Sequence, residues 1–298
     1  MFKNVIVGVD GRNGGRDAVA LAQRLLDARG RLTLVNVHLE TTAVIVHEFD
    51  SSARAETQRL LEREREAAGG KPEIASVGGT SVAVGLHRYA EEQAADLLVV
   101  GACRRGAFAR VLVGDDTRES LRCAPCAVAI APREYRDAPE PMEVIGVGYD
   151  AAPESRAALS QARELAGSGT ADIHVLILVA AVRFDGEELS PLNSVLGTDP
   201  RLIAMRRQLE DFDRVTARPA FGPPVEELNA FGEEVDLLLL GSPSEGPKGQ
   251  LVADRTAKRL ARAPRCPLLV IPLPSAPPEF AGNGRAQREA GAGLRAMP

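Results

Sequence analysis

The chain has 298 residues, about twice the commonest domain size, so its length favours two domains. Hydrophobic residues make up 45% and charged residues 26%, which is ordinary for a globular protein and excludes a wholly disordered chain. The net charge of −5 disfavours partners that are bound through a nucleic-acid backbone, and 4% aromatic residues are too few for a base-stacking surface.

The sequence predicts a cytoplasmic protein that makes no membrane contact. Asp10 lies in the stretch that a signal peptide would keep apolar. The longest strongly apolar run, residues 175–182, is far shorter than the ~20 residues that cross a bilayer. Four cysteines in a chain of this length do not suggest a disulfide framework.

An internal repeat divides the chain into two similar halves. The stretch Asp96-Leu-Leu-Val-Val-Gly101 matches Asp236-Leu-Leu-Leu-Leu-Gly241 at an offset of 140 residues, and the same offset equates Asp10 with Asp150. Helical spacing and strand ends stay in register over the whole repeat, which indicates a duplication.

Apolar runs and amphipathic stretches alternate in each half. In the first half we expect strands at residues 5–9, 32–37, 73–77, 97–100 and 127–131. The helices expected between them cover residues 16–28, 51–67, 81–94 and 116–122. In the second half we expect strands at residues 144–149, 174–179, 215–217, 237–240 and 268–271.

This alternation predicts an α/β fold of two tandem Rossmann-like domains, each an open five-stranded parallel sheet with helices on both faces. The predicted domains are residues 1–132 and 142–273, joined by a linker at 133–141 and followed by a disordered tail at 274–298. Ligands of such sheets bind beyond the carboxyl ends of the strands. In the first half, that rule selects Asp10, Val37 and the loop that opens at Gly101.

The repeat resembles the universal stress protein domain over nearly all of residues 1–272. The resemblance rests on the opening Val-Gly-Val-Asp-Gly, on the strand that ends at Gly101, and on the Arg-x-Ala-Pro-Cys-x-Val ending at residues 122–128. It implies an adenine nucleotide alpha hydrolase-like fold and a non-catalytic role in the stress response. It also implies that domains pair through their last strands, so the chain is a monomeric pseudo-dimer or a homodimer.

Family members that bind ATP carry a glycine-rich loop, and this chain departs from that motif. Gly101 and Gly114 match its first and third glycines, whereas Arg104 replaces the second and Asp115 replaces a hydroxyl residue. Arg104 removes conformational freedom, and the carboxylate of Asp115 repels phosphate, although Thr117 supplies a nearby hydroxyl. The resemblance also assigns Asp10 and Val37 to the adenine end of the nucleotide. A carboxylate at a strand end has another explanation, because it can cap the turn that follows.

The second half departs further from the motif. Gly241 remains, but Ser244 and Asp254 replace the next two glycines and Arg255 replaces the hydroxyl residue. We therefore expect this half to bind no nucleotide.

Other candidate motifs have simpler explanations. Cys123-x-x-Cys126 has redox spacing, but we expect it at a helix C-terminus, so packing is favoured over reactivity; Cys103, in the ligand loop, is more open to oxidation. The four histidines show no metal-ligand spacing. Mixed charges at residues 54–66 indicate a solvated helix face laced with ion pairs.

Three functions follow as hypotheses. The first is a stress protein that binds ATP or a related adenine nucleotide in its first half. The second is a nucleotide-independent interaction module that acts as an intrachain pseudo-dimer with unknown protein partners. The third, a slow ATPase, has the least support because the sequence shows no general base next to a metal-binding triphosphate loop.

Overall fold

The computed structural model describes residues 1–39, 47–102, 120–137, 142–167, 171–178, 200–210, 212–242 and 251–273. We call the part from β1 to β6 unit 1 and the part from β7 to β12 unit 2. The elements of unit 1 are β1 (Phe2–Gly8), α1 (Asn13–Leu25), β2 (Leu26–Leu39), α2 (His47–Ala67), β3 (Glu73–Gly79), α3 (Val82–Glu92), β4 (Leu97–Gly101), β5 (Arg122–Ala124) and β6 (Ala127–Ala131). After the short helix η1 (Tyr135–Asp137), those of unit 2 are β7 (Val144–Tyr149), α5 (Pro153–Gly167), β8 (Asp172–Leu178), α7 (Pro200–Glu210), β9 (Val215–Ala220), α8 (Pro224–Phe231), β10 (Leu237–Ser242), β11 (Leu251–Val252), α9 (Arg255–Leu260) and β12 (Leu268–Pro272).

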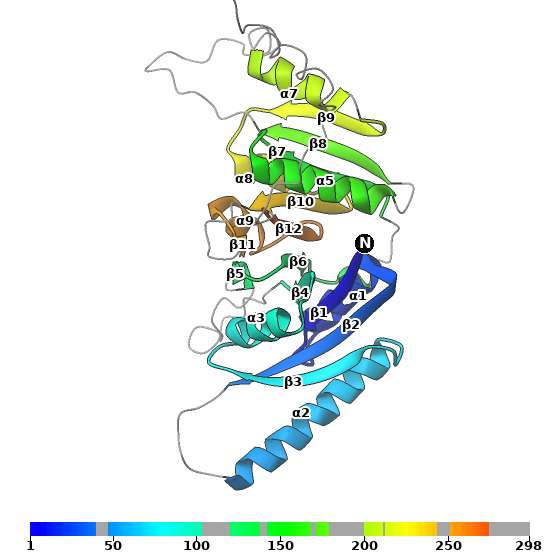
Figure 1. Cartoon of the computed structure of the whole chain (residues 1–298), viewed down its shortest axis with the longest axis vertical. Coiled ribbons are helices and arrows are strands. Elements are labelled where there is room, and N and C mark those ends of the chain that lie inside the picture. Colours follow the sequence, from blue (N-terminus) through cyan, green and yellow to red (C-terminus); the bar gives the residue numbers. More distant parts are fainter. Residues whose placement is uncertain are drawn as a thin grey trace, which may run out of the picture.

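The ten long strands form one continuous sheet in the order β3-β2-β1-β4-β6-β12-β10-β7-β8-β9 (Figure 1). Neighbours are parallel within each unit, which confirms the predicted α/β class and the five parallel strands of each half. Helices α1, α2, α5 and α7 pack on one face, and α3, α8 and α9 pack on the other. Each of these two apolar layers runs through both units, so the units share one core.

The two units meet through their last strands, as the resemblance implies. β6 and β12 pair antiparallel, and the central pair of this ladder joins Ala129 to Leu269. These two residues are 140 positions apart, so the duplication equates them. The register therefore places a pseudo-twofold axis at this pair.

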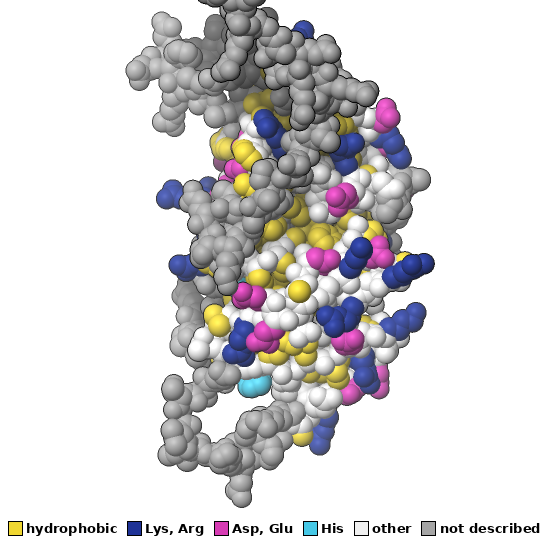
Figure 2. Space-filling model, viewed as in Figure 1, with side chains coloured by type: hydrophobic (Ala, Val, Ile, Leu, Met, Phe, Trp, Pro, Cys, Tyr) yellow, Lys and Arg dark blue, Asp and Glu magenta, His cyan; other side chains and the backbone are white. Residues whose placement is uncertain are grey.

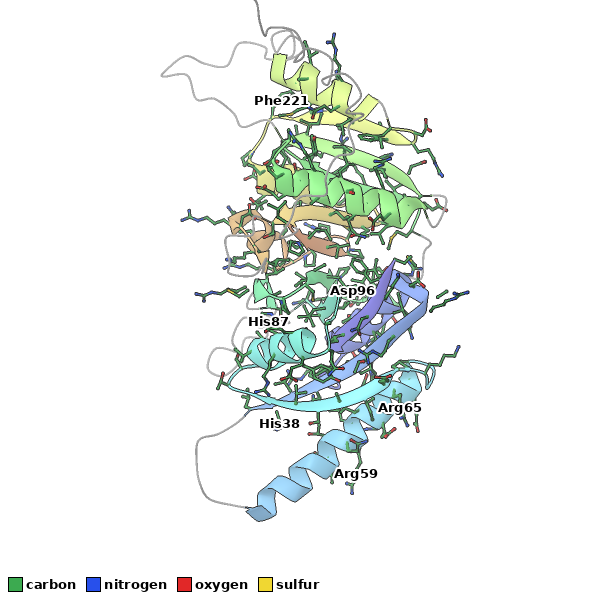
Figure 3. The ribbon with its side chains drawn as sticks, viewed as in Figure 1. His38, Arg59, Arg65, His87, Asp96 and Phe221 are labelled. Atoms are coloured by element: carbon green, nitrogen blue, oxygen red, sulfur yellow. The ribbon has the colours of Figure 1, made fainter. Side chains whose placement is uncertain are left out.

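Hydrogen bonds repeat with the same offset at the amino edge of the sheet. The carboxylate of Asp96 accepts from the backbone N–H groups of residues 3 and 4, at 2.7 and 3.0 Å. The carboxylate of Asp236 accepts from those of residues 143 and 144, both at 2.8 Å. The aspartate that anchors the sequence repeat thus ties β1 or β7 to the strand beside it, on the edge opposite the predicted ligand site (Asp96 in Figure 3).

Several predicted boundaries differ from the structure. The helix predicted for residues 116–122 is wrong at its end, because residues 122–124 form strand β5, which pairs antiparallel with β11 of unit 2. That pairing joins segments far apart in the sequence, so local periodicity does not reveal it. β2 begins at Leu26, six residues before its predicted start, which also shortens α1 at its end.

The described part of the predicted linker, residues 133–137, packs against unit 1. Asp17 of α1 is 2% exposed, and its carboxylate accepts from the N–H groups of Glu134 and Arg136, at 3.1 and 3.3 Å. The Arg24 guanidinium lies 5.6 Å from the centre of the Tyr135 ring, a cation–π distance. The predicted tail at 274–298 lies outside the described residues.

Among the helices that the structure describes, none is long and apolar enough to cross a membrane.

Candidate functional site

The turn between β1 and α1 forms the centre of the candidate site in unit 1. One carboxylate oxygen of Asp10 accepts from the N–H of Arg12 at 3.0 Å, so this side chain does cap its own turn. The Asp10 side chain is still 56% exposed. Gly11 has a φ of +76°, a conformation that glycine adopts without strain.

The first turn of α1 carries no acidic residue of its own, and the carboxylate of Asp10 lies beside it in the turn that precedes the helix. This first turn contains Gly14 and Gly15, and the N-cap residue Arg12 makes no side-chain capping bond. The first N–H groups of a helix lack partners within the helix and carry a partial positive charge. This end of α1 therefore suits an anion.

The end of β4 presses directly against this helix end. A Cβ on Gly101 would lie 2.1 Å from the carbonyl oxygen of Gly14, far inside van der Waals contact. Gly15 is also close to the strand ends, because its Cβ would lie 3.4 Å from a carboxylate oxygen of Asp10. Two predicted site residues, Asp10 and Gly101, thus converge on the Gly14–Gly15 turn.

Val37 lies one strand further along the sheet and packs against α3. A Cβ on Gly85 of α3 would lie 2.6 Å from a methyl carbon of Val37, so glycine is needed for this contact. The preceding side chain, Asn36, donates to the carbonyl oxygen of Val9 at 2.8 Å and ties the carboxyl ends of β1 and β2 together.

The predicted ligand loop is described only at its two ends. Arg104, Gly114, Asp115 and Thr117 lie outside the described residues, as does Cys103. Where the chain is described again, the carbonyl oxygen of Ser120 lies 3.0 Å from Nε2 of His87 on α3 (His87 in Figure 3). This contact positions the end of the loop against α3.

Unit 2 repeats this geometry with different side chains. Asp150 caps its turn through the N–H of Ala152 at 3.0 Å. A Cβ on Gly241 would lie 2.0 Å from the carbonyl oxygen of Glu154, as Gly101 does against Gly14. The first turn of α5, however, starts with Pro153 and carries the acidic Glu154.

An ion pair that has no counterpart in unit 2 supports the start of α1. The guanidinium of Arg16 contacts the Glu64 carboxylate of α2 at 3.0 to 3.2 Å, and Glu64 is 4% exposed. The carboxylate raises the pKa of Arg16 through hydrogen bonding and charge. The prediction of a wholly solvated face on α2 is therefore wrong at Glu64, although Arg59 is exposed (Figure 3).

The cysteines support packing rather than reactivity at two positions. Cys126 and Cys266 are buried free thiols, and burial raises the pKa of each to about 12. Cys123 is exposed and lies in β5, not at the predicted helix C-terminus. Within the described ranges, no three His, Cys, Asp or Glu side chains gather closely enough to hold a metal ion.

A family model for the universal stress protein family matches the chain twice, at residues 1–132 and 142–272. The chain belongs to the universal stress protein family. The universal stress protein Rv2319c of Mycobacterium tuberculosis is 26% identical over 206 residues, covering 64% of this chain and 69% of that protein.

A solved structure has the same overall fold. The universal stress protein of Archaeoglobus fulgidus matches with a TM-score of 0.63 at 17% identity, covering 90% of this chain and 97% of that one. At this identity the likeness supports the fold alone, and the fold does not name a ligand.

Sequence reasoning missed three features of the site in unit 1. Gly14 was visible as part of a glycine-rich turn, and its exchange for Glu154 at the repeat offset is the signal that separates the two sites. The contacts of Asn36 and His87 carry no such signal, because each depends on which loop the fold brings next to it.

Proposed function

We propose that this universal stress protein is a non-catalytic regulatory protein that binds ATP or a related adenine nucleotide at the carboxyl edge of unit 1. The observation that carries the proposal is the first turn of α1, which contains Gly14 and Gly15, has no acidic residue and lies against the end of β4. Backbone N–H groups at such a helix end attract phosphate. The stress-response role rests on family membership.

The adenine end of the nucleotide is assigned to Asp10 and Val37. The half-exposed carboxylate of Asp10, one oxygen of which lies 3.7 Å from Nε of Arg12, is an acceptor for a ribose hydroxyl or the adenine amine, and Val37 offers apolar contact at the neighbouring strand. We assign the phosphates to the N-terminus of α1 and to the loop between Gly101 and Thr117. In this proposal the positive charge of Arg104 offsets the negative charge of Asp115.

Unit 2 is proposed to bind no nucleotide. Glu154 places a carboxylate in the helix turn where phosphate would sit, and unit charges about 4 Å apart repel by a few kcal/mol near a protein surface. We propose a cytoplasmic location, which the free thiols of Cys126 and Cys266 support because reducing compartments keep thiols unpaired.

Calorimetric titration with ATP and AMP tests the nucleotide proposal, with one saturable site per chain as the expected result. Gly14→Glu copies the charge of unit 2 into unit 1, and the nearest atom to a Cβ there is 3.6 Å away, so the variant should fold. It should weaken binding at least about tenfold, whereas the uncharged Gly14→Gln should retain it. Restoring the motif with Arg104→Gly and Asp115→Ser should strengthen binding.

Two results would remove the proposal. If ATP and AMP give no saturable heat at millimolar concentration, the protein is the nucleotide-independent interaction module. If Gly14→Glu and Gly14→Gln bind equally well while both stay folded, the ligand does not sit at the N-terminus of α1.

A further inference from the structure

Five cations gather on unit 2, on α9 and in the turn that follows it. This basic surface comprises Arg255, Lys258, Arg259, Arg262 and Arg265. All are exposed except Lys258, which is half-buried. Figure 2 shows Lys and Arg side chains projecting along the edge of the molecule where Figure 1 places α9, β11 and β5.

Among the residues that the structure describes, most of these cations have no ion-pair partner. Nε of Arg265 lies 3.5 Å from a Glu233 carboxylate oxygen, but no described carboxylate forms an ion pair with the other four cations. Two carboxylates of this unit have other partners, because Asp254 caps α9 by accepting from the N–H of Ala257 at 2.8 Å and Glu234 pairs with Arg218 at 2.7 Å. Exposed like charges that lie close together repel one another, and an anionic partner lowers this repulsion.

The corresponding segment of unit 1 does not carry this charge. Residues 255–265 contain five basic and no acidic residues, whereas residues 115–125 contain two basic and three acidic ones. Both segments belong to repeats of one fold, so the fold itself does not require the cations. The basic surface also contrasts with the chain as a whole, which has a net charge of −5.

Pairing of the units extends the basic surface toward unit 1. In the antiparallel pair β5–β11, Arg122 lies opposite Val252, three residues before the first cation of α9. Arg122 is exposed. Arg122 of unit 1 therefore lies near the start of the basic surface in the chain order of unit 2.

The shape and composition of the basic surface restrict the class of partner that it can bind. The pocket next to α9 is lined by nine residues, of which only Arg265 belongs to the basic surface, so the cations do not converge on a small ligand. Residues 251–273 contain no aromatic ring on which a base could stack. The large hydrophobic side chains exposed in the described part are Met1, Leu39, Val84 and Ile203, all outside this surface, so nothing here inserts into a membrane.

We propose that the basic surface binds an extended acidic segment of a partner protein. A segment of about ten residues, at about 3.3 Å per residue, is long enough to cross α9 and the turn that follows. Binding would depend on charge, so it would be fast and sensitive to salt. The interaction does not involve the nucleotide site of unit 1.

The test uses the full chain and a fluorescein-labelled peptide of alternating Glu and Ser, followed by anisotropy at low salt. Lys258→Gln, Arg259→Gln and Arg262→Gln together should weaken binding about tenfold, since each lost charge contact contributes a small factor. The control combines Arg29→Gln, Arg59→Gln and Lys71→Gln, three exposed cations of unit 1, and removes the same charge. The control should change the affinity less than about twofold.

Saturable binding that the α9 variant weakens and the control does not, and that added salt weakens, supports the proposal. The proposal is overturned if both triple variants weaken peptide binding by the same factor, because net charge then explains the binding. It is also overturned if the wild-type chain does not bind the peptide, or if a thymidine oligonucleotide of equal length or a phosphatidylserine vesicle binds as tightly.

Discussion

Compared with the carboxyl edge of unit 1, the same edge of unit 2 keeps the backbone geometry and changes the side chains around it. Gly101 and Gly241 both lie against the first turn of a helix, where an added Cβ would be 2.1 and 2.0 Å from a carbonyl oxygen. Because the approach is the same in a unit that carries Glu154 at the helix end, the fold explains the glycine in both units. The ligand preference must come from what surrounds it.

The largest effect is expected from substitutions that disrupt the close contact between strand and helix, which both edges share. Gly101→Ala and Gly241→Ala each place a Cβ against backbone atoms, which cannot move aside as a flexible side chain would. Each should lower the free energy of unfolding by about 4 kcal/mol, measured by urea denaturation. Gly167→Ala, where no atom lies within 4 Å of a Cβ, is the control and should leave stability unchanged. If either strand glycine tolerated alanine, the shared-geometry argument would be wrong.

The next effect is a loss of stability that is expected in unit 1 but not in unit 2. Arg16→Met leaves the carboxylate of Glu64 buried without its partner and should cost about 3 kcal/mol. Arg156, at the equivalent place in unit 2, is exposed, so Arg156→Met should change the free energy of unfolding by less than about 0.5 kcal/mol. Equal costs for the two variants would show that the ion pair with Glu64 adds nothing.

A smaller effect tests the tether of the linker to unit 1. Asp17→Ala removes the acceptor of two backbone N–H groups and should cost about 2 kcal/mol. The repeat places Ala157 at the equivalent position of α5, so unit 2 has no carboxylate there. Limited proteolysis near residues 133–141 should become faster in Asp17→Ala than in the wild-type chain, and unchanged cleavage would argue against the tether.

The smallest effect is a loss of stability at alkaline pH, which should be equal in the two units. Burial raises the pKa of the Cys126 and Cys266 thiols from 9.0 to about 12, so the folded chain keeps both protons at a pH where the unfolded chain releases them. The stabilisation is complete below pH 9 and is lost as the pH rises from there toward 12. At pH 10 each thiol should therefore lower the free energy of unfolding by about 1 to 2 kcal/mol relative to neutral pH.

Urea denaturation at pH 8 and pH 10 measures this loss. The free energy of unfolding should fall less between pH 8 and pH 10 in Cys126→Ala and in Cys266→Ala than in the wild-type chain. The reduction should be the same for both variants, since the thiols occupy equivalent positions of the repeat. A thiol reagent should label exposed Cys123 in the folded protein at pH 8 while these two remain unlabelled. Labelling of Cys126 without unfolding would contradict its burial.

Much of the fold follows from the sequence because its signals are local or repeated. Apolar strands such as residues 97–100 are continuous because parallel strands are buried on both faces. Predicted boundaries differ from the structure where distant segments pair, as at β5, and local charge patterns on α2 do not reveal that Glu64 is buried, because its partner lies on α1. For the candidate site, Asp10 and Gly101 were found from strand ends, whereas the contact of His87 with Ser120 depends on a tertiary approach.

The sequence alone determined that the chain is one α/β unit written twice, because a constant offset of 140 residues keeps helical faces and strand ends in register. Only the tertiary structure decided how the copies join. Antiparallel pairing of β6 with β12 merges two sheets into one, and pairing of β5 with β11 places Arg122 of unit 1 opposite Val252 of unit 2. The physical reason is that strand pairing is a long-range choice of backbone partners, and residue patterns along the chain specify faces but not neighbours.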